Sequence, residues 1–292
     1  MPLIETVTKI SEQDKQLFKE VKKVKATDIM KGFSFPTGID HLVVDEHKNI
    51  LNYCTEGYSL VENKKIFLPI EEKLRSGKVD FIRQVRTVTD SQFYVTYLLK
   101  SKNTKKLGEL YPRLTIVNSY DGKVKFRHEF GWFRLVCTNG LTRPHGETNI
   151  QVSKHSADLT EASLLFLIHD ILKDTEVFLD ETKRDLERYE KLNSKKVTAK
   201  LIAEVTKELK LSDKLADTAT NRFNLETGGS SEPFSYVDLD GNLRSGRVAD
   251  PTLFTLYNAI NFAIYNENPK EPLDSKQKKD SALLELVEAK LN

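Results

Sequence analysis

The hydrophobic pattern of this 292-residue chain changes period once, near Asp158, and this change constrains the fold more than any other feature. Before it, β-branched and aromatic residues alternate with polar ones in short runs, which is typical of strands. After it, apolar residues recur every three or four positions to about residue 192 with no Gly or Pro between, which predicts a long helix. We therefore predict an α+β fold in which an antiparallel β-meander of the N-terminal half packs on long helices of the C-terminal half.

The same pattern divides the chain into a short arm and one domain. Residues 1–31 mix charged and apolar side chains without a clear period, and we expect a short helical arm there. Residues 32–292 contain no repeat and no domain break, so we predict a single α+β domain, β-rich over 32–157 and α-rich over 158–292.

Two segments of the β-rich part make specific predictions. The runs at residues 81–88 and 92–100 are joined by Thr89, Asp90 and Ser91, and this arrangement predicts a hairpin. The segment at residues 57–77 is predicted to begin as a strand, to turn near Asn63 and to end as a short helix over residues 71–75.

The α-rich part predicts several further helices. Helices are expected near residues 198–209 and 212–223, the second capped by Ser212. A later helix is expected to begin with Asp250 as its cap and Pro251 in its first turn, and a short terminal helix to begin at Ser281. Residues 227–251 are rich in Gly, Ser, Pro and Asp and predict an irregular loop or hairpin, which is a flexible lid, a partner-binding flap or a plain surface excursion.

The clearest local signal is a hairpin centred on Asp121 and Gly122, a pair suited to a tight turn because Gly accepts a positive φ freely. Two sets of side chains alternate along the arm after this turn, so one face should be apolar and the other mostly basic. The apolar set is Val124, Phe126, His128 and Phe130, and the charged set is Lys123, Lys125, Arg127 and Glu129.

This basic hairpin is the candidate binding surface, because cations neutralise phosphates and aromatic rings stack on bases. Strand alternation opposes a single composite surface unless Gly131 introduces a bulge, and the alternative interpretation is a solvated face over an ordinary core. The predicted nucleic-acid-binding residues are Lys123, Lys125, Arg127, Trp132, Arg134, Arg143 and His155.

No motif in the chain predicts catalysis, a metal site or a cofactor, and we expect a protein that is not an enzyme. HExxH, GxSxG, Walker and GxGxxG patterns are missing from the sequence. Cys54 and Cys137 lack the spacing of metal ligands or of a disulfide framework, which favours a reducing compartment. His128, His145 and His155 leave a cryptic hydrolase or metal site as the weakest hypothesis, against hydrogen-bonded or loop histidines.

Charge and hydropathy limit the class of partner. The 45 basic and 43 acidic side chains give a net charge of +2, and this net charge is too small to attract the whole protein electrostatically to nucleic acid. No apolar run approaches the roughly 18 residues of a membrane span, and the N-terminal sequence lacks the pattern of a secretion signal. We therefore expect that the protein does not associate with a membrane and that it is located in the cytoplasm of a host cell.

An ordered series of motifs resembles a known family. NSYDG at 118–122, FRLVCTNGL at 133–141 and SKHS at 153–156 are similar to the domain-of-unknown-function family 932, often called phage/plasmid-like proteins. GYSLVENKKIFLPI and LYNAINFAIYN resemble further segments of that family, although Tyr120 stands where His is usual and Asn261 where many relatives have Thr. The resemblance implies a mobile-element setting, namely a phage, prophage or conjugative plasmid, and no established activity.

Two functions from different classes follow as hypotheses. The leading one is a non-enzymatic nucleic-acid binder, with single-stranded DNA favoured, that acts as a homo-oligomer in phage or plasmid recombination or replication. A β-meander backed by long helices resembles single-strand annealing proteins, at the level of fold alone. The rival is a protein-binding inhibitor of a host defence or polymerase complex that uses residues 227–250 and the helical half, and the near-neutral charge favours it.

Overall fold

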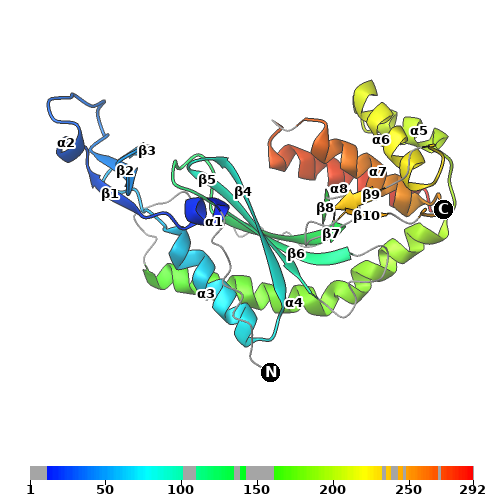
Figure 1. Ribbon diagram of the computed structural model, residues 1–292, viewed down its shortest axis with the longest axis horizontal. Helices are drawn as coiled ribbons and strands as arrows, with labels where there is room; N and C mark the ends of the chain where they lie inside the picture. The colour runs from blue at the N-terminus through cyan, green and yellow to red at the C-terminus, as the bar shows by residue number, and fades with distance from the viewer. Residues whose placement is uncertain are drawn as a thin grey trace. The chain divides into compact units, whose positions relative to one another are not determined.

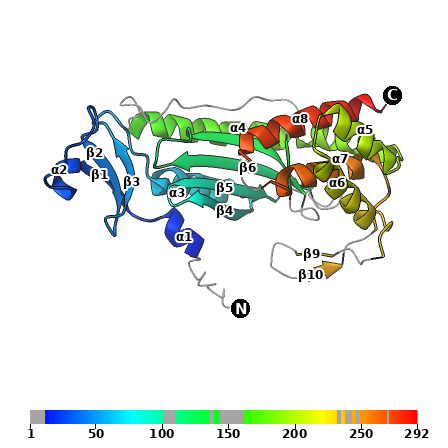
Figure 2. The ribbon, with the colours of Figure 1, turned by 90° about the horizontal axis from the view of Figure 1, so that it is seen from above.

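The computed structural model has the predicted α+β architecture, with antiparallel strands in the N-terminal half and helices in the C-terminal half (Figures 1 and 2). It describes residues 12–100, 110–134, 139–142, 161–231, 235–237, 243–245, 248–268 and 271–291. The chain forms two compact units, and the single domain predicted for residues 32–292 stays a prediction. Unit 1 comprises residues 1–98, 114–129 and 147–176, and unit 2 comprises residues 99–113, 130–146 and 177–292.

A three-stranded antiparallel sheet in unit 1 corrects the prediction of a helical arm. Its strands are β1 (Val21–Lys25), β2 (His41–Asp45) and β3 (Ile50–Cys54), in that order. The arm is helical over α1 (Glu12–Leu17) and α2 (Ala26–Ile29), but β1 pairs with β2, placing Val21 opposite Asp45. Pairing and the burial of Val21 outweigh the helix propensity of the lysines in this segment.

The second sheet is a meander of five strands in sequence order. Its strands are β4 (Phe81–Thr89), β5 (Gln92–Leu99), β6 (Leu110–Ser119), β7 (Arg127–Arg134) and β8 (Asn139–Thr142). The hairpin of β4 and β5 is confirmed, and β6 and β7 are neighbours as predicted. Residues 120–126 nevertheless form a longer loop than the predicted tight turn, with Gly122 at φ +66°. Phe126 is buried and Lys125 exposed, as the alternation predicts, but Glu129 of the predicted charged face is buried.

Helix α3 (Asn63–Ser76) corrects the prediction of a strand followed by a short helix. It begins at Asn63, where a turn was expected, and carries Pro69 in its interior. Proline removes one helical hydrogen bond, but the helix buries a stripe of apolar side chains at helical spacing, and this burial favours the longer helix. The stripe consists of Ile66, Phe67, Ile70 and Leu74.

Helix α4 (Glu161–Ser194) is the long helix that the change of period predicts. Within unit 1 it buries Leu164, Leu167 and Ile171, and His128 of β7 lies against Asp174. Within unit 2 the rings of Phe130 and Phe178 are 5.0 Å apart, so β7 packs on this helix there as well.

The remaining helices form unit 2 around α7 (Leu253–Asn266), whose side chains are nearly all buried. Figure 1 labels the others, which are α5 (Lys200–Glu208), α6 (Asp213–Glu226) and α8 (Leu273–Ala289). Ser212 caps α6 as predicted, since its hydroxyl accepts a hydrogen bond from the N–H of Leu215. None of the described helices combines the length and the apolar character that crossing a membrane requires.

Two helix starts in unit 2 differ from the sequence prediction. The cap of α7 is Thr252, which accepts a hydrogen bond from the N–H of Thr255, and not Asp250. Helix α8 begins at Leu273, eight residues before the predicted start at Ser281. Its first turns contain buried Lys276 and Asp280, whose burial a polar, linker-like sequence does not reveal. Residues 227–250 contain an antiparallel ribbon, β9 (Ser235–Val237) with β10 (Leu243–Ser245), in agreement with the hairpin alternative.

Candidate functional site

The seven predicted nucleic-acid-binding residues do not form one surface. Lys123 and Lys125 are exposed on the loop of residues 120–126. The side chain of Arg127 is only 12% exposed, and its Nε lies 3.0 Å from the carboxylate of Glu129. Arg134 is the last residue of β7, and the remaining two predictions, Arg143 and His155, lie outside the described residues.

Trp132 requires a correction, because its indole is part of the core of unit 2. The ring is fully buried, and its Nε1–H donates a hydrogen bond of 3.2 Å to Asp185. The rings of Phe178 and Tyr189 lie at 6.1 and 6.4 Å from it, both in edge-on geometry. A ring enclosed in this way is not available to stack on a base, so its assignment to an exposed binding surface is wrong.

His128 is a core residue as well. Its side chain is fully buried, and Nε2 lies 3.2 Å from Asp174 Oδ2. Burial lowers the pKa of His128, although the charges of Asp174 and Asp170 act in the opposite direction. His145 of the proposed histidine group lies outside the described residues, and over the part of the chain that the structure describes no group of three His, Cys, Asp or Glu is arranged to hold a metal ion.

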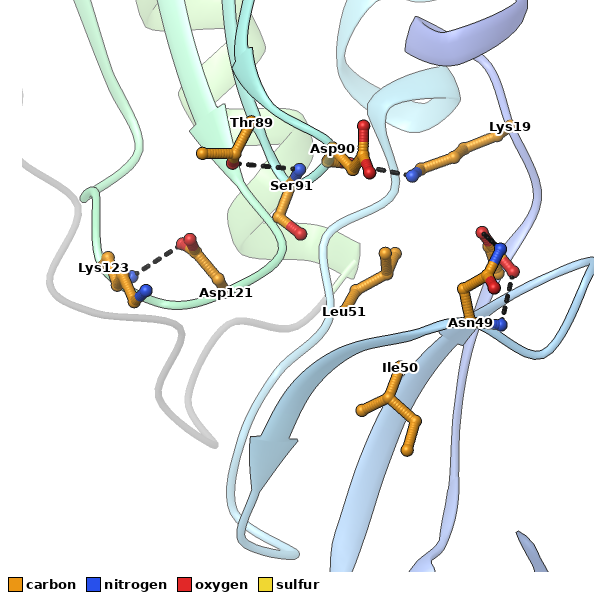
Figure 3. A pocket seen from close by; sticks show the side chains of 10 residues that line it. Lys19, Asn49, Ile50, Leu51, Thr89, Asp90, Ser91, Asp121 and Lys123 are labelled. Carbon is orange, nitrogen blue, oxygen red and sulfur yellow. Dashed lines mark hydrogen bonds between the residues drawn. The ribbon is translucent and has the colours of Figure 1, made fainter.

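A polar cavity of about 520 Å³ in unit 1 is the candidate site (Figure 3). It lies where three turns meet, namely those between β2 and β3, between β4 and β5, and between β6 and β7. The connection from α1 to β1 adds Lys19, and the apolar part of the wall is made by Ile50 and Leu51 of β3. The volume lies within the roughly 300 to 1,000 Å³ of typical small-molecule sites.

Two lysines bring positive charge to the cavity. Lys19 Nζ donates a hydrogen bond of 2.8 Å to the main-chain carbonyl of Asp90. Burial lowers the pKa of Lys19, and the nearby charges of Asp45 and Asp90 oppose that shift. Lys123 is exposed, and its ammonium group has no hydrogen-bond or ion-pair partner among the described residues, so it can bind an anion.

Asp45 belongs to the cavity wall but is mainly a turn residue. Its carboxylate accepts hydrogen bonds from the main-chain N–H groups of His47 and Asn49, at 2.9 and 2.8 Å, and from the Asn49 side chain at 3.0 Å. Burial alone would raise the pKa of Asp45, but these hydrogen bonds outweigh it and hold the pKa below its ordinary value. Asp45 therefore fixes the turn between β2 and β3.

Asp90 and Asp121 are the other two carboxylates of the wall. Asp90 Oδ1 accepts a hydrogen bond of 2.8 Å from Gln16. Asp121 accepts one bond of 2.8 Å from Gln92 and one of 3.0 Å from the main-chain N–H of Lys123. Because an ionised carboxylate offers about four acceptor positions, both retain capacity for a ligand.

The sequence identified several residues of this site but not that they lie together in the folded chain. Asp90, Ser91 and Asp121 were recognised as turn residues, and Lys123 as a basic residue of the hairpin. Nothing in the sequence places Lys19 or Asn49 at this site, because their position depends on the packing of the small sheet of β1 to β3 beside the turns of the meander.

The comparisons with known proteins extend the sequence resemblance. A family model described as "Domain of unknown function (DUF932)" matches residues 50–285, from the start of β3 into α8. No curated protein and no solved structure gives a significant match. Lys19, Asp45 and Asn49 precede the matched segment, whereas the cavity residues from Ile50 to Lys123 lie within it.

Proposed function

Because the chain belongs to the domain-of-unknown-function family DUF932, its role has to be argued from its own residues, and we propose that it is a non-enzymatic nucleic-acid-binding protein that favours single-stranded DNA. The observation that carries this proposal is the cavity of unit 1, to which Lys19 and Lys123 bring two cations from separate segments of the chain. The exposed Lys125 extends the positive charge along the same loop.

The chemistry of the cavity fits a nucleotide in several respects. Ammonium groups neutralise phosphates, and the apolar side chains of Ile50 and Leu51 offer a surface for a base or sugar. Thr89 and Ser91 add hydroxyl groups, which donate and accept hydrogen bonds. A cavity of this size admits a base only after the base has unstacked from its neighbours. Unstacking costs less free energy in an unpaired strand than in a duplex, where the base pair must also be broken.

The proposed mode of binding differs from the one that the sequence suggested. Trp132 and Phe126 are buried, so aromatic stacking does not contribute through them, and the lysines act by contact with phosphates. Three lysines that each neutralise one phosphate give a slope of about −2 for log affinity against log salt on single strands. The carboxylates of Asp45, Asp90 and Asp121 reduce the local positive potential, so we expect moderate affinity.

The setting that we propose is recombination or replication of a phage or plasmid in the host cytoplasm. Binding without chemistry is part of the same proposal. Assembly into homo-oligomers along a strand is part of this proposal.

Fluorescence anisotropy tests the proposal directly. Labelled single- and double-stranded oligonucleotides are titrated with the full chain at two salt concentrations, and we expect salt-sensitive binding that favours the single strand. Reversing charge at Lys123→Glu with Lys125→Glu should weaken binding at least tenfold, whereas Lys31→Glu, an exposed lysine of the same unit away from the cavity, should not. No binding at low salt, or equal effects of the two variants, overturns the proposal.

A second function has one observation in its favour. Leu165 and Phe166 near the start of α4 are 61% and 73% exposed, and adjacent apolar side chains of this size are typical of protein-binding surfaces. We propose binding to a host defence or polymerase complex as the alternative function. A pull-down from host lysate treated with nuclease distinguishes the two, because a protein partner stays bound after nucleic acid is removed and should be lost with Phe166→Ser.

A further inference from the structure

We infer that the cavity of unit 1 discriminates among bases and accepts cytosine in preference to thymine. This inference rests on the proposed function, because it names the part of a single strand that enters the same cavity. It is carried by the carboxylates of Asp90 and Asp121 (Figure 3), which accept hydrogen bonds from Gln16 and Gln92 and still have acceptor capacity.

The two carboxylates are positioned before any ligand arrives. Gln16 reaches Asp90 Oδ1, and Oδ2 of the same side chain has no hydrogen bond among the described residues. Asp121 receives one hydrogen bond on each oxygen, from Lys123 and from Gln92, which fixes its plane and leaves further lone pairs. A base that enters the cavity therefore meets acceptors rather than donors at these positions.

The two pyrimidines differ at the group that such acceptors would read. Cytosine carries an amino group at N4, which donates hydrogen bonds, and carboxylates are suitable acceptors for it. Thymine carries a carbonyl oxygen at the equivalent position, and two acceptors that face each other repel and leave both unpaired. Thymine also carries a methyl group, which requires additional room.

Contacts of the lysines with groups that the two pyrimidines share do not alter this difference. Both pyrimidines carry the same O2 carbonyl and the same phosphate, so contacts of Lys19 or Lys123 with those groups add equally to both complexes. The preference therefore depends on the carboxylates, whereas the salt dependence depends on the lysines. Replacing the carboxylates by amides should therefore remove the preference while the phosphate contacts of the lysines remain.

The experiment compares labelled oligo-dC and oligo-dT of equal length with the full chain at about pH 8, where cytosine is neutral. We expect oligo-dC to bind roughly tenfold more tightly, the size of effect that a well-placed base contact gives. In Asp90→Asn with Asp121→Asn each side chain keeps an acceptor and gains an amide donor that pairs with thymine O4, so the preference should disappear. Asp80→Asn changes an exposed carboxylate of the same unit outside the cavity and should keep it.

The outcomes separate this inference from the proposed function. A preference for oligo-dC that is lost in the double variant and kept in Asp80→Asn supports the inference. Salt-sensitive binding of both oligonucleotides with equal affinity, or a preference that survives in the double variant, overturns the inference and leaves the proposed function standing. Failure to bind either oligonucleotide overturns both.

Discussion

The cavity of unit 1 and the core of unit 2 use polar side chains in opposite ways. Around the cavity, Asp90 and Asp121 lie on turns, take part in local hydrogen bonds and still face open space. In unit 2, Trp132 donates to Asp185 and Tyr257 donates to Asp280 among buried apolar side chains. The buried polar groups of unit 2 contribute to stability, whereas the carboxylates of the cavity remain available to a ligand.

The largest expected effect tests the buried side of this comparison. Replacing Trp132→Ala removes the ring that packs on Phe178 and Tyr189, and we expect a loss of about 3 to 5 kcal/mol in the free energy of unfolding. Urea unfolding followed by circular dichroism measures it. Phe33→Ala removes an aromatic side chain that is 66% exposed and should change stability by less than about 0.5 kcal/mol. Similar losses in the two variants would contradict the assignment of the indole to the core.

A smaller effect distinguishes the observed cap of α7 from the one that the sequence predicted. The hydroxyl of Thr252 accepts from the N–H of Thr255 and donates to Asn193, so Thr252→Val should lower the free energy of unfolding by about 1 kcal/mol. Asp250 is exposed, and Asp250→Ala should have an effect of less than about 0.5 kcal/mol. If the larger loss came from Asp250→Ala, the start of this helix would be misassigned.

The buried histidine of unit 1 predicts a pH dependence. Burial lowers the pKa of His128 below its ordinary value of 6.5, against the charges of Asp174 and Asp170. The unfolded chain then binds the proton more readily, so the stability that neutral His128 allows is complete above pH 6.5 and falls as the pH drops below it. Denaturant titrations at about pH 8 and about pH 5.5 should show a smaller difference for His128→Gln than for the wild type. The exposed His169→Gln serves as the control and should leave the difference unchanged.

The smallest expected effect lies at the cavity. Asp90 is exposed and accepts one side-chain hydrogen bond, from Gln16, so Asp90→Asn should change the free energy of unfolding by less than about 0.5 kcal/mol. Thermal unfolding monitored by calorimetry checks this. A loss of several kcal/mol would mean that this carboxylate maintains the fold, and the contrast between the two regions would then fail.

The elements with a strong period were predictable from the sequence, because burial of one face dictates that period. Helix α4 and the hairpin of β4 and β5 follow their patterns closely. Helix α3 was misread because Pro69 is a strong local signal that tertiary burial overrides. The start of α8 was missed because Lys276 and Asp280 are typical surface residues, and only their partners in the folded chain explain their burial.

The candidate site was predictable only in its separate parts. The turn residue Asp121 and the exposed Lys123 both follow from the hairpin pattern. In the folded chain these two residues lie beside Lys19 and Asn49, and Lys19 is about a hundred residues away in the sequence. No hydrophobic periodicity predicts such a contact. The alternation along β7 already opposed one surface of cations and aromatic rings, and the burial of Trp132 agrees with that physical argument.

The chain contains one tryptophan, Trp132, and because it lies in unit 2 its fluorescence is an intrinsic probe of that unit. The emission of Trp132 depends on its surroundings, which include Asp185 and two aromatic rings of unit 2, so the spectrum reports on this part of the core. A ligand that occupies the cavity of unit 1 without affecting the rest of the protein will leave the emission spectrum of Trp132 unchanged. A change in emission on titration would therefore show, without any added label, that binding alters the surroundings of Trp132 in unit 2.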